Sequence, residues 1–256
     1  MNRLAQEKKV CALIPARLNS VRFPGKALKQ IDGIPMVVRV LAAARNSGVF
    51  DAVYAATDSP EIAAVCQTYG FEAVFTSHSH QNPTSRIQEA VTILEDSKSA
   101  SSRKFDFYAM IGGDEPLLTP EILQNFMEQA LTVITSKENV QRPFLINAMA
   151  DIPNDAETAD PSNIKVVCRP DGTGLYISRA PIPFRKGTLD EPSRKFVLFR
   201  SRALYAGIAR FLLPEQTGHS GTDRGRGFAA FPRIWENDPI SSHLRIYAFR
   251  RHPRRP

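Results

Sequence analysis

Short apolar runs alternate with helical stretches over the first half of the chain, and this alternation limits its fold more than any other feature. Val10–Ile14 is an apolar run that ends at Pro15. The next such run, Ala52–Ala56, follows residues 37–44, whose apolar side chains recur at helical spacing. The same order continues to about Ser136. Strands separated by helices of ten or more residues are typical of βαβ units, so the sequence predicts an α/β fold with a mostly parallel sheet.

The pattern changes after residue 136. Residues 144–149 are expected to form one more strand, and residues 164–168 and 175–178 two strands of a hairpin around Asp171-Gly172. This predicts an antiparallel arm or sub-domain attached to the parallel sheet. The other elements expected in the first half are strands at 73–75 and 107–111 and helices at about 60–69, 84–95 and 120–136.

The length of 256 residues suits one large α/β domain, or a domain with a sub-domain. Apolar residues make up 43% of the chain, which argues against disorder, and no apolar run approaches the roughly 18–20 residues of a membrane span. The first residues do not resemble a signal peptide. Cys11, Cys66 and Cys168 each lie in an apolar run, as buried free thiols do. We therefore expect a cytoplasmic protein without membrane contact.

The positive charge of the chain is confined to one segment. The formal net charge is +7 at pH 7, but residues 198–256, here called the tail, carry eleven Arg and no Lys against four acids. The first 197 residues carry 22 basic and 22 acidic side chains. A neutral body argues against a nucleic-acid-binding surface over the whole domain. We predict a core of residues 1–197 and an atypical Arg-rich tail of residues 198–256, in which no helix with an apolar face is evident.

The first predicted strand leads into the loop Pro15–Lys26, which carries Arg17, Arg22 and Lys26. In an open α/β sheet, ligands bind beyond the carboxyl ends of the strands. Flexible backbone near Ser20 and a Gly before the last Lys offer amide donors, and the three cations can neutralise phosphate oxygens. The loop has neither the Walker A pattern nor G-x-G-x-x-G. It therefore predicts a triphosphate site of another kind than a P-loop or a dinucleotide site.

A second polar constellation, Gly112–Pro116, follows another apolar strand. Asp114 at a strand end is a good Mg²⁺ ligand, because hard cations prefer carboxylate oxygens together with a phosphate. Glu115 is the weaker candidate, since the Pro after it can simply shape a turn. Together with the first loop, Asp114 predicts metal-assisted phosphoryl or nucleotidyl transfer. His78 and His80 lie two residues apart, but without a third ligand nearby we interpret them as part of a polar loop.

Further candidate residues lie at other strand and helix ends. Thr57 and Asp58 end a strand, where they can contact a base or cap the next helix. Arg86 stands at a helix start and has the forked geometry that binds a substrate carboxylate. Arg179 follows the second hairpin strand, where it can do the same or pair with an acid.

These motifs resemble those of the sugar-acid cytidylyltransferases over about residues 9–197. Within that family the likeness is strongest to the branch that uses 3-deoxy-manno-octulosonate (Kdo). The assignment to this branch depends on the motifs RFPGKAL and SRAPIP. The resemblance implies a Rossmann-like nucleotidyltransferase fold. The matching segments are IPARLNSVRFPGKAL (14–28), VYAATDSPEI (53–62), HQNPTSRIQEA (80–90), GGDEPLL (112–118), NIKVVCRPDGTGLYISRAPIPF (163–184) and KFV (195–197).

The resemblance implies transfer of CMP from CTP to Kdo, giving CMP-Kdo and pyrophosphate for lipopolysaccharide synthesis, with Mg²⁺ as cofactor and a homodimer as the assembled form. By likeness, Arg17 and Lys26 hold the triphosphate, Asp114 binds Mg²⁺ and Arg86 lies near the sugar acid. Gly112 departs from the family, which usually has a Gln in contact with the nucleotide there. The further substrate-binding residues that we predict are Ala16, Ser20, Arg22, Thr57, Asp58, Gly112 and Arg179.

The tail departs from the family more strongly. By the resemblance, family members continue with a strand, a helix that carries Glu-Gln, and a closing Val-Asp-Thr-Pro whose Asp is the second metal ligand. We expect neither that strand nor that helix in residues 198–256, and Val-Asp-Thr-Pro does not occur there. Codons can be chosen for residues 222–240 and 250–256 that, read one base later, encode the family-like strings QIEGVDSLRFLEYGKTIR and VDTPED. We therefore hypothesise that the chain after about Val197 is translated out of frame, and we expect weak or absent activity.

Other functions stay open. The sugar acid could be a sialic acid or 8-amino-Kdo, or the protein could be an inactive nucleotide-binding remnant whose basic tail binds nucleic acid. Retention of RNA or DNA that falls steeply with salt would favour the remnant. CTP-dependent release of pyrophosphate would favour the enzyme.

Overall fold

The computed structural model describes residues 8–19, 23–96, 104–135, 145–151, 158–182, 196–206 and 245–249. The predicted strands and helices of residues 10–178 are present, with bounds that differ by no more than about two residues. The elements follow one another as β1 (Val10–Ala16), η1 (Lys26–Leu28), β2 (Gln30–Ile31), β3 (Ile34–Pro35), α1 (Met36–Asn46), β4 (Ala52–Thr57), α2 (Pro60–Thr68), β5 (Glu72–Phe75), α3 (Pro83–Glu95), β6 (Phe107–Ile111), α4 (Pro120–Thr135), β7 (Leu145–Asp151), β8 (Lys165–Cys168), β9 (Gly174–Ser178), β10 (Phe196–Ala206) and β11 (Arg245–Phe249).

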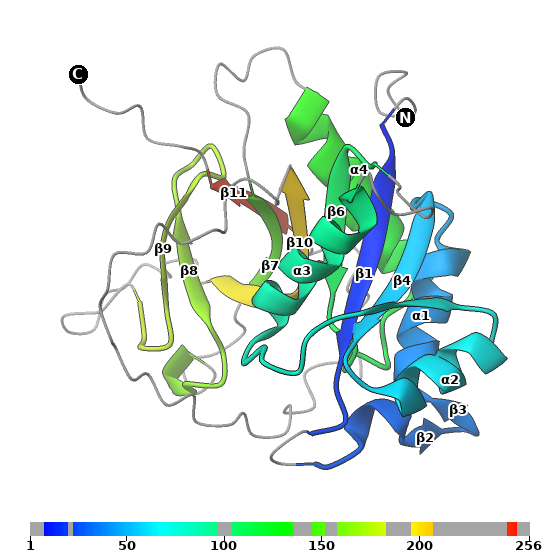
Figure 1. Ribbon diagram of the computed structural model, residues 1–256. Helices are drawn as coiled ribbons and strands as arrows, with labels where there is room; N and C mark the ends of the chain where they lie inside the picture. Colours follow the sequence, from blue (N-terminus) through cyan, green and yellow to red (C-terminus); the bar gives the residue numbers. More distant parts are fainter. Residues whose placement is uncertain are drawn as a thin grey trace.

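One sheet joins nine strands of the described residues, in the order β11-β7-β10-β6-β1-β4-β5, and the hairpin β8–β9 is attached through β10. The neighbours β6, β1, β4 and β5 pair in parallel. Strands β10, β7 and β11 pair antiparallel. Figure 1 shows the hairpin set apart from the parallel strands. The prediction of an α/β fold that combines a parallel sheet with an antiparallel arm is confirmed.

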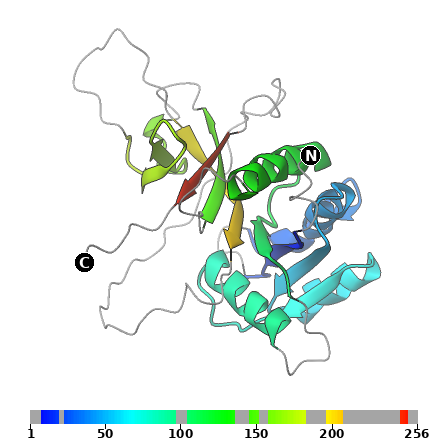
Figure 2. The same cartoon turned by 90° about the horizontal axis from the view of Figure 1, so that it is seen from above.

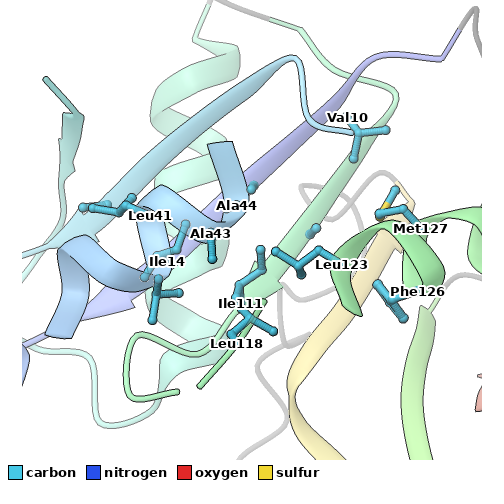
Figure 3. Packing of buried hydrophobic residues seen from close by; sticks show 14 of the residues in the cluster. Val10, Ile14, Leu41, Ala43, Ala44, Ile111, Leu118, Leu123, Phe126 and Met127 are labelled. Atoms are coloured by element: carbon cyan, nitrogen blue, oxygen red, sulfur yellow. The ribbon is translucent and has the colours of Figure 1, made fainter. Parts of the chain in front are cut away.

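The inner parallel strands β1, β4 and β6 are buried on both faces, which explains why they are continuous apolar runs. Helix α3 covers one face, and α1, α2 and α4 cover the other (Figure 2). In β1, Ala12 and Ile14 pack toward the helices α1 and α4, whereas Cys11 and Leu13 pack toward α3. Figure 3 shows the larger cluster, in which Ile14 and Ile111 from the strands lie near Leu41 from α1 and Leu123 from α4.

The three cysteines are free thiols, as predicted. Cys11 and Cys66 are buried, but Cys168 is only half-buried, because it stands in the arm rather than in the main core. Burial raises the pKa of Cys66 and that of Cys168 to about 11. Both side chains are therefore protonated and unreactive at neutral pH.

Strand β10 crosses the predicted boundary at residue 197. It pairs with β6 through residues 202–206 and with β7 on its other side. Strand β11, also from the tail, extends the sheet beyond β7. These two strands were not predicted, because no alternation of strand and helix marks them in the sequence after residue 197. The division into a core and a tail stays a prediction, but residues 198–206 and 245–249 are part of the sheet.

Within the part of the chain that the structure describes, no helix combines the length and the apolar character of a membrane span.

Candidate active site

Several of the predicted site residues gather at one edge of the sheet. Because β1, β4 and β6 are parallel neighbours, the loops that follow them leave from the same edge. Ala16 at the end of β1 lies opposite Thr57 at the end of β4. Arg17 follows directly and is exposed, and Gly112 follows β6 and is half-buried. Three segments far apart in sequence thus meet where a ligand of an α/β sheet is expected.

An ion pair joins the two motifs on which the nucleotide prediction rests. Lys26 Nζ lies 3.0 Å from Asp114 Oδ2, although the residues are 88 positions apart. The side chains are 31% and 55% exposed, and a pair this open to water contributes little stability. Lys26 begins η1 after Gly25, whose φ of 68° is in the left-handed region and whose amide donates to Leu18 O at 2.9 Å. The two loops therefore present a cation and a carboxylate as an ion pair. When the pair opens, Lys26 can bind a phosphate oxygen and Asp114 a metal ion.

Gly113 fixes how closely these two loops approach. A Cβ atom at this position would lie 2.7 Å from Pro15 O and 3.2 Å from Ile14 Cγ2. Both atoms belong to the buried end of β1, so neither can move away easily. Only glycine fits here, and its lack of a side chain lets the chain carrying Asp114 pass close to β1. This role of Gly113 was not predicted from the sequence, and the Gly-Gly pair before Asp114 was the available signal.

Replacing Gly113 with Ala is expected to lower the free energy of unfolding by about 1–3 kcal/mol, the usual cost of overpacking. The added methyl group must push the loop after β6 away from Pro15, which separates Asp114 from Lys26. We therefore expect weaker binding of CTP as well. Denaturant unfolding and calorimetric titration with CTP and Mg²⁺ check the two effects. Unchanged stability and CTP affinity would contradict the close approach.

Asp58 is held by an internal ion pair. Its Oδ2 accepts a hydrogen bond from Arg86 Nη2 at 2.9 Å, and His78 Nδ1 lies 3.3 Å away. Arg86 is 3% exposed, and its Nη1 donates to Thr76 Oγ1 at 2.6 Å. Partial burial raises the pKa of Asp58, but the hydrogen bond and charge of Arg86 outweigh it, so the pKa lies below its usual value. Arg86 thereby ties the ends of β4 and β5 to α3, and its predicted contact with the sugar acid stays a prediction.

Replacing Arg86 with Met is expected to cost about 3 kcal/mol of stability at pH 7, because the Asp58 carboxylate loses its partner. A carboxyl with a lowered folded-state pKa stabilises the fold above its unfolded-state pKa, and that stability is lost as the pH falls through the folded-state value. In the Met variant, the free energy of unfolding should therefore fall less steeply as the pH is lowered. Denaturant titrations between about pH 7 and pH 3 measure this.

Arg39 offers a matched control, because it pairs with the 87% exposed Asp32 at 3.0 Å. Replacing Arg39 with Met should cost less than the change at Arg86, since the Asp32 carboxylate is exposed and stays hydrated without its partner. Equal losses in the two variants would contradict an internal role for Arg86.

The start of α2 settles one alternative. Ser59 is the N-cap residue, and its hydroxyl accepts from the Ile62 amide at 3.2 Å. Thr57 is fully buried, and its Oγ1 accepts from the Ser59 amide at 3.1 Å. The interpretation of Thr57 or Asp58 as the helix cap is therefore wrong, because the residue after them has the short hydroxyl and the extended backbone that a cap needs.

The histidine loop is braced by hydrogen bonds. His80 Nε2 pairs with Glu89 Oε2, and its Nδ1 lies 3.1 Å from Ser85 Oγ. Burial raises the pKa of Glu89, but its bonds with His80 and the Ser77 amide outweigh this and lower the pKa. Among the described residues, no group of three or more His, Cys, Asp or Glu side chains could hold a metal ion. Asp114 therefore stands without clustered protein ligands in the part of the chain described.

Of the remaining predicted residues, the structure describes only Arg179. Arg179 follows β9, and its Nη1 donates to Pro161 O at 2.8 Å. Its hairpin joins the sheet through β10, not through a parallel strand. Ser20 and Arg22 lie outside the described residues.

Comparisons with known proteins agree with this geometry. A family model described as cytidylyltransferase matches residues 11–253. The 3-deoxy-manno-octulosonate cytidylyltransferase of Neisseria meningitidis serogroup A / serotype 4A is 39% identical over 205 residues, covering 78% of this chain and 75% of that protein. The enzyme of the same name from Polynucleobacter necessarius subsp. necessarius is 35% identical over 212 residues, covering 83% and 77%.

A solved structure resembles this fold. The structure of CMP:2-keto-3-deoxy-manno-octonic acid synthetase complexed with CTP is similar with a TM-score of 0.64 and 29% identity, covering 77% of this chain and 74% of that one. The resemblance drawn from the sequence motifs is confirmed by these matches. The loops after β1 and β6 meet through the Lys26–Asp114 pair at one edge of the sheet. Together with the family match over residues 11–253, this shows that the chain belongs to the cytidylyltransferase family.

Proposed function

We propose that the protein transfers CMP from CTP to Kdo, giving CMP-Kdo and pyrophosphate, as a step toward lipopolysaccharide. The observation that carries this proposal is the pairing of Lys26 with Asp114 at the carboxyl edge of the parallel sheet. The pair supports the proposal because it joins a cation suited to binding phosphate to a carboxylate suited to binding Mg²⁺. The names of the relatives support CTP as the nucleotide and Kdo as the acceptor.

In the proposed reaction, the anomeric hydroxyl of Kdo attacks the α-phosphorus of CTP. The new O–P bond forms as the bond to the β-phosphate oxygen breaks, the hydroxyl proton is released, and pyrophosphate leaves. Lys26 and Arg17 are the cations that would neutralise the triphosphate. Ala16 and Gly112 would lie against the nucleotide through their backbone, because they end β1 and follow β6.

The residues present fit a Mg²⁺ ion that is bound together with the nucleotide. Nucleotidyltransferases of this kind typically use a divalent metal, and Mg²⁺ is commonly held by one or two carboxylates plus substrate phosphates. Asp114 supplies one carboxylate, and it is 55% exposed. When bound, the ion would offset the negative charge that grows on the leaving pyrophosphate. Lys26 Nζ would then move from Asp114 to a phosphate oxygen.

The out-of-frame origin of the tail stays our hypothesis, and it implies weak turnover by this chain. Residues 207–244 and 250–256, which hold most of the tail, lie outside the described residues. A cytoplasmic location and a homodimer remain parts of the proposal.

Pyrophosphate release tests the function. Purified protein would be incubated with Mg²⁺, CTP and one of Kdo, 8-amino-Kdo or a sialic acid, and with ATP, GTP or UTP in place of CTP. We expect release to require CTP and to be fastest with Kdo. Calorimetric titration of CTP with Mg²⁺ reports the nucleotide site even where turnover is slow. Faster release with a sialic acid, or no CTP binding, would contradict the proposal.

A further inference from the structure

A lysine lies fully buried at the base of the β8–β9 hairpin. Lys165 is the first residue of β8 and is 0% exposed. Its backbone pairs with Ser178 of β9 and with Val197 of β10, so it stands where the hairpin joins the main sheet. A buried ammonium group is tolerated only where hydrogen-bond acceptors surround it.

Main-chain carbonyl groups supply these acceptors. Lys165 Nζ donates to Asp160 O at 2.9 Å, to Asn163 O at 2.7 Å and to Arg179 O at 2.5 Å. An ammonium group has three N–H donors and a neutral amine has two, so only the charged form satisfies all three carbonyl groups. Burial holds the pKa of Lys165 below its usual value; the charge of Asp160 raises it and the charge of Arg179 lowers it. The donors of Lys165 are thus engaged inside the protein, out of reach of any substrate.

The turn of residues 160–163, two of whose carbonyl groups bind Lys165, also holds the Arg179 side chain. Arg179 Nη1 donates to Pro161 O at 2.8 Å, between the two residues whose carbonyl groups Lys165 holds. The turn is closed further by the Ser162 amide, which donates to Asp160 Oδ1 at 2.7 Å. Lys165 therefore fixes the main chain of Arg179 directly and its side chain through the turn. Arg179 itself is exposed, unlike Lys165.

We propose that Lys165 is a positioning residue that holds Arg179 in place to bind the carboxylate of the sugar acid. This inference rests on the proposed function, because it takes Arg179 as the cation that meets an anionic acceptor. Lys165 acts only through Arg179, and the nucleotide residues of the parallel edge do not depend on it.

The test compares two substitutions of similar length. Lys165→Met removes all three donors, and Lys165→Gln keeps two on its amide nitrogen. Kdo would be titrated calorimetrically into each protein saturated with CTP and Mg²⁺, and CTP would be titrated separately. We expect Kdo affinity to fall at least about tenfold in Lys165→Met and by less in Lys165→Gln, with CTP affinity within about twofold of the unsubstituted chain. Lys104→Met, a change at an exposed lysine, is the control and should alter neither affinity.

A merely structural lysine would give a different result. Unchanged Kdo affinity in a Lys165→Met protein that still binds CTP would overturn the proposal, as would an unsubstituted chain that binds CTP but no Kdo. Equal losses of CTP and Kdo affinity would show general damage to the fold and would also overturn it. Failure of the unsubstituted chain to bind CTP would instead overturn the proposed function. Should Lys165→Met not fold, Lys165→Gln carries the same comparison.

Discussion

Asp114→Asn is expected to reduce CTP-dependent pyrophosphate release at least about 100-fold, the effect of losing one group that stabilises charge in a transition state. The change keeps the shape of the side chain and removes its negative charge. Mg²⁺ then loses its carboxylate ligand, so the dependence of CTP affinity on Mg²⁺ should vanish. Without Mg²⁺, CTP should bind more tightly than before, because Lys26 no longer pairs with Asp114 and no carboxylate repels the phosphates. Calorimetry with and without Mg²⁺ measures both changes.

Asp32→Asn is the matched control for this experiment. Asp32 also pairs with a cation, Arg39, at the same distance of 3.0 Å, but it lies in the turn between β2 and β3. Its φ of 48° is tolerated by Asn. This variant should keep pyrophosphate release and the Mg²⁺ dependence of CTP binding. A loss of similar size in both variants, or a CTP affinity that still depends on Mg²⁺ in Asp114→Asn, would contradict the metal role of Asp114.

Restoring the shifted reading frame after about Val197 is expected to raise pyrophosphate release at least about 100-fold, the effect of regaining a group that stabilises charge in the transition state. The restored chain would regain the family-like segment QIEGVDSLRFLEYGKTIR and the closing Val-Asp-Thr-Pro, whose Asp would be a second carboxylate for Mg²⁺. A metal ion held by two carboxylates is better placed to stabilise charge on the leaving group. The measurement compares kcat/KM of the two chains with CTP, Mg²⁺ and Kdo.

A restored chain in which that closing Asp is changed to Asn separates the metal ligand from the rest of the tail. It should fold as well as the restored chain and show most of the loss in rate. The hypothesis fails if the shifted frame contains stop codons, if it does not encode the family motif, or if the present chain already turns over as fast as the restored one.

The fold was predictable from the sequence wherever local signals and burial agree. Parallel strands buried on both faces are continuous apolar runs, so their bounds can be read from the sequence. Helix α2 begins at Ser59 with Pro60 after it, a local pattern that marks a helix start. Strand β10 could not be predicted in this way. Its pairing with β6 and β7 depends on segments distant in sequence.

The sequence predicted which loops form the candidate site, but not which side chains contact one another within it. The motifs after β1 and β6 indicated where cations and a carboxylate would meet, and the Lys26–Asp114 pair agrees with this. Arg86 looked from its position like a free substrate-binding side chain, but its burial against Asp58 and Thr76 is decided by tertiary packing. The roles of Gly113 and Lys165 likewise depend on backbone atoms of distant or turn residues, which carry no sequence signature.

The place of β10 sets an order of events during synthesis. Among the described strands, β7 pairs only with β10 and β11, both of which come later in the chain. A ribosome-bound chain that has emerged as far as β7 can complete the parallel strands, but it exposes the open edges of β6 and β7 until residues 196–206 appear. Pairings between segments so far apart form slowly, because a long loop must close first. The interval before β10 emerges is therefore when the nascent protein is most exposed to aggregation and most dependent on chaperones.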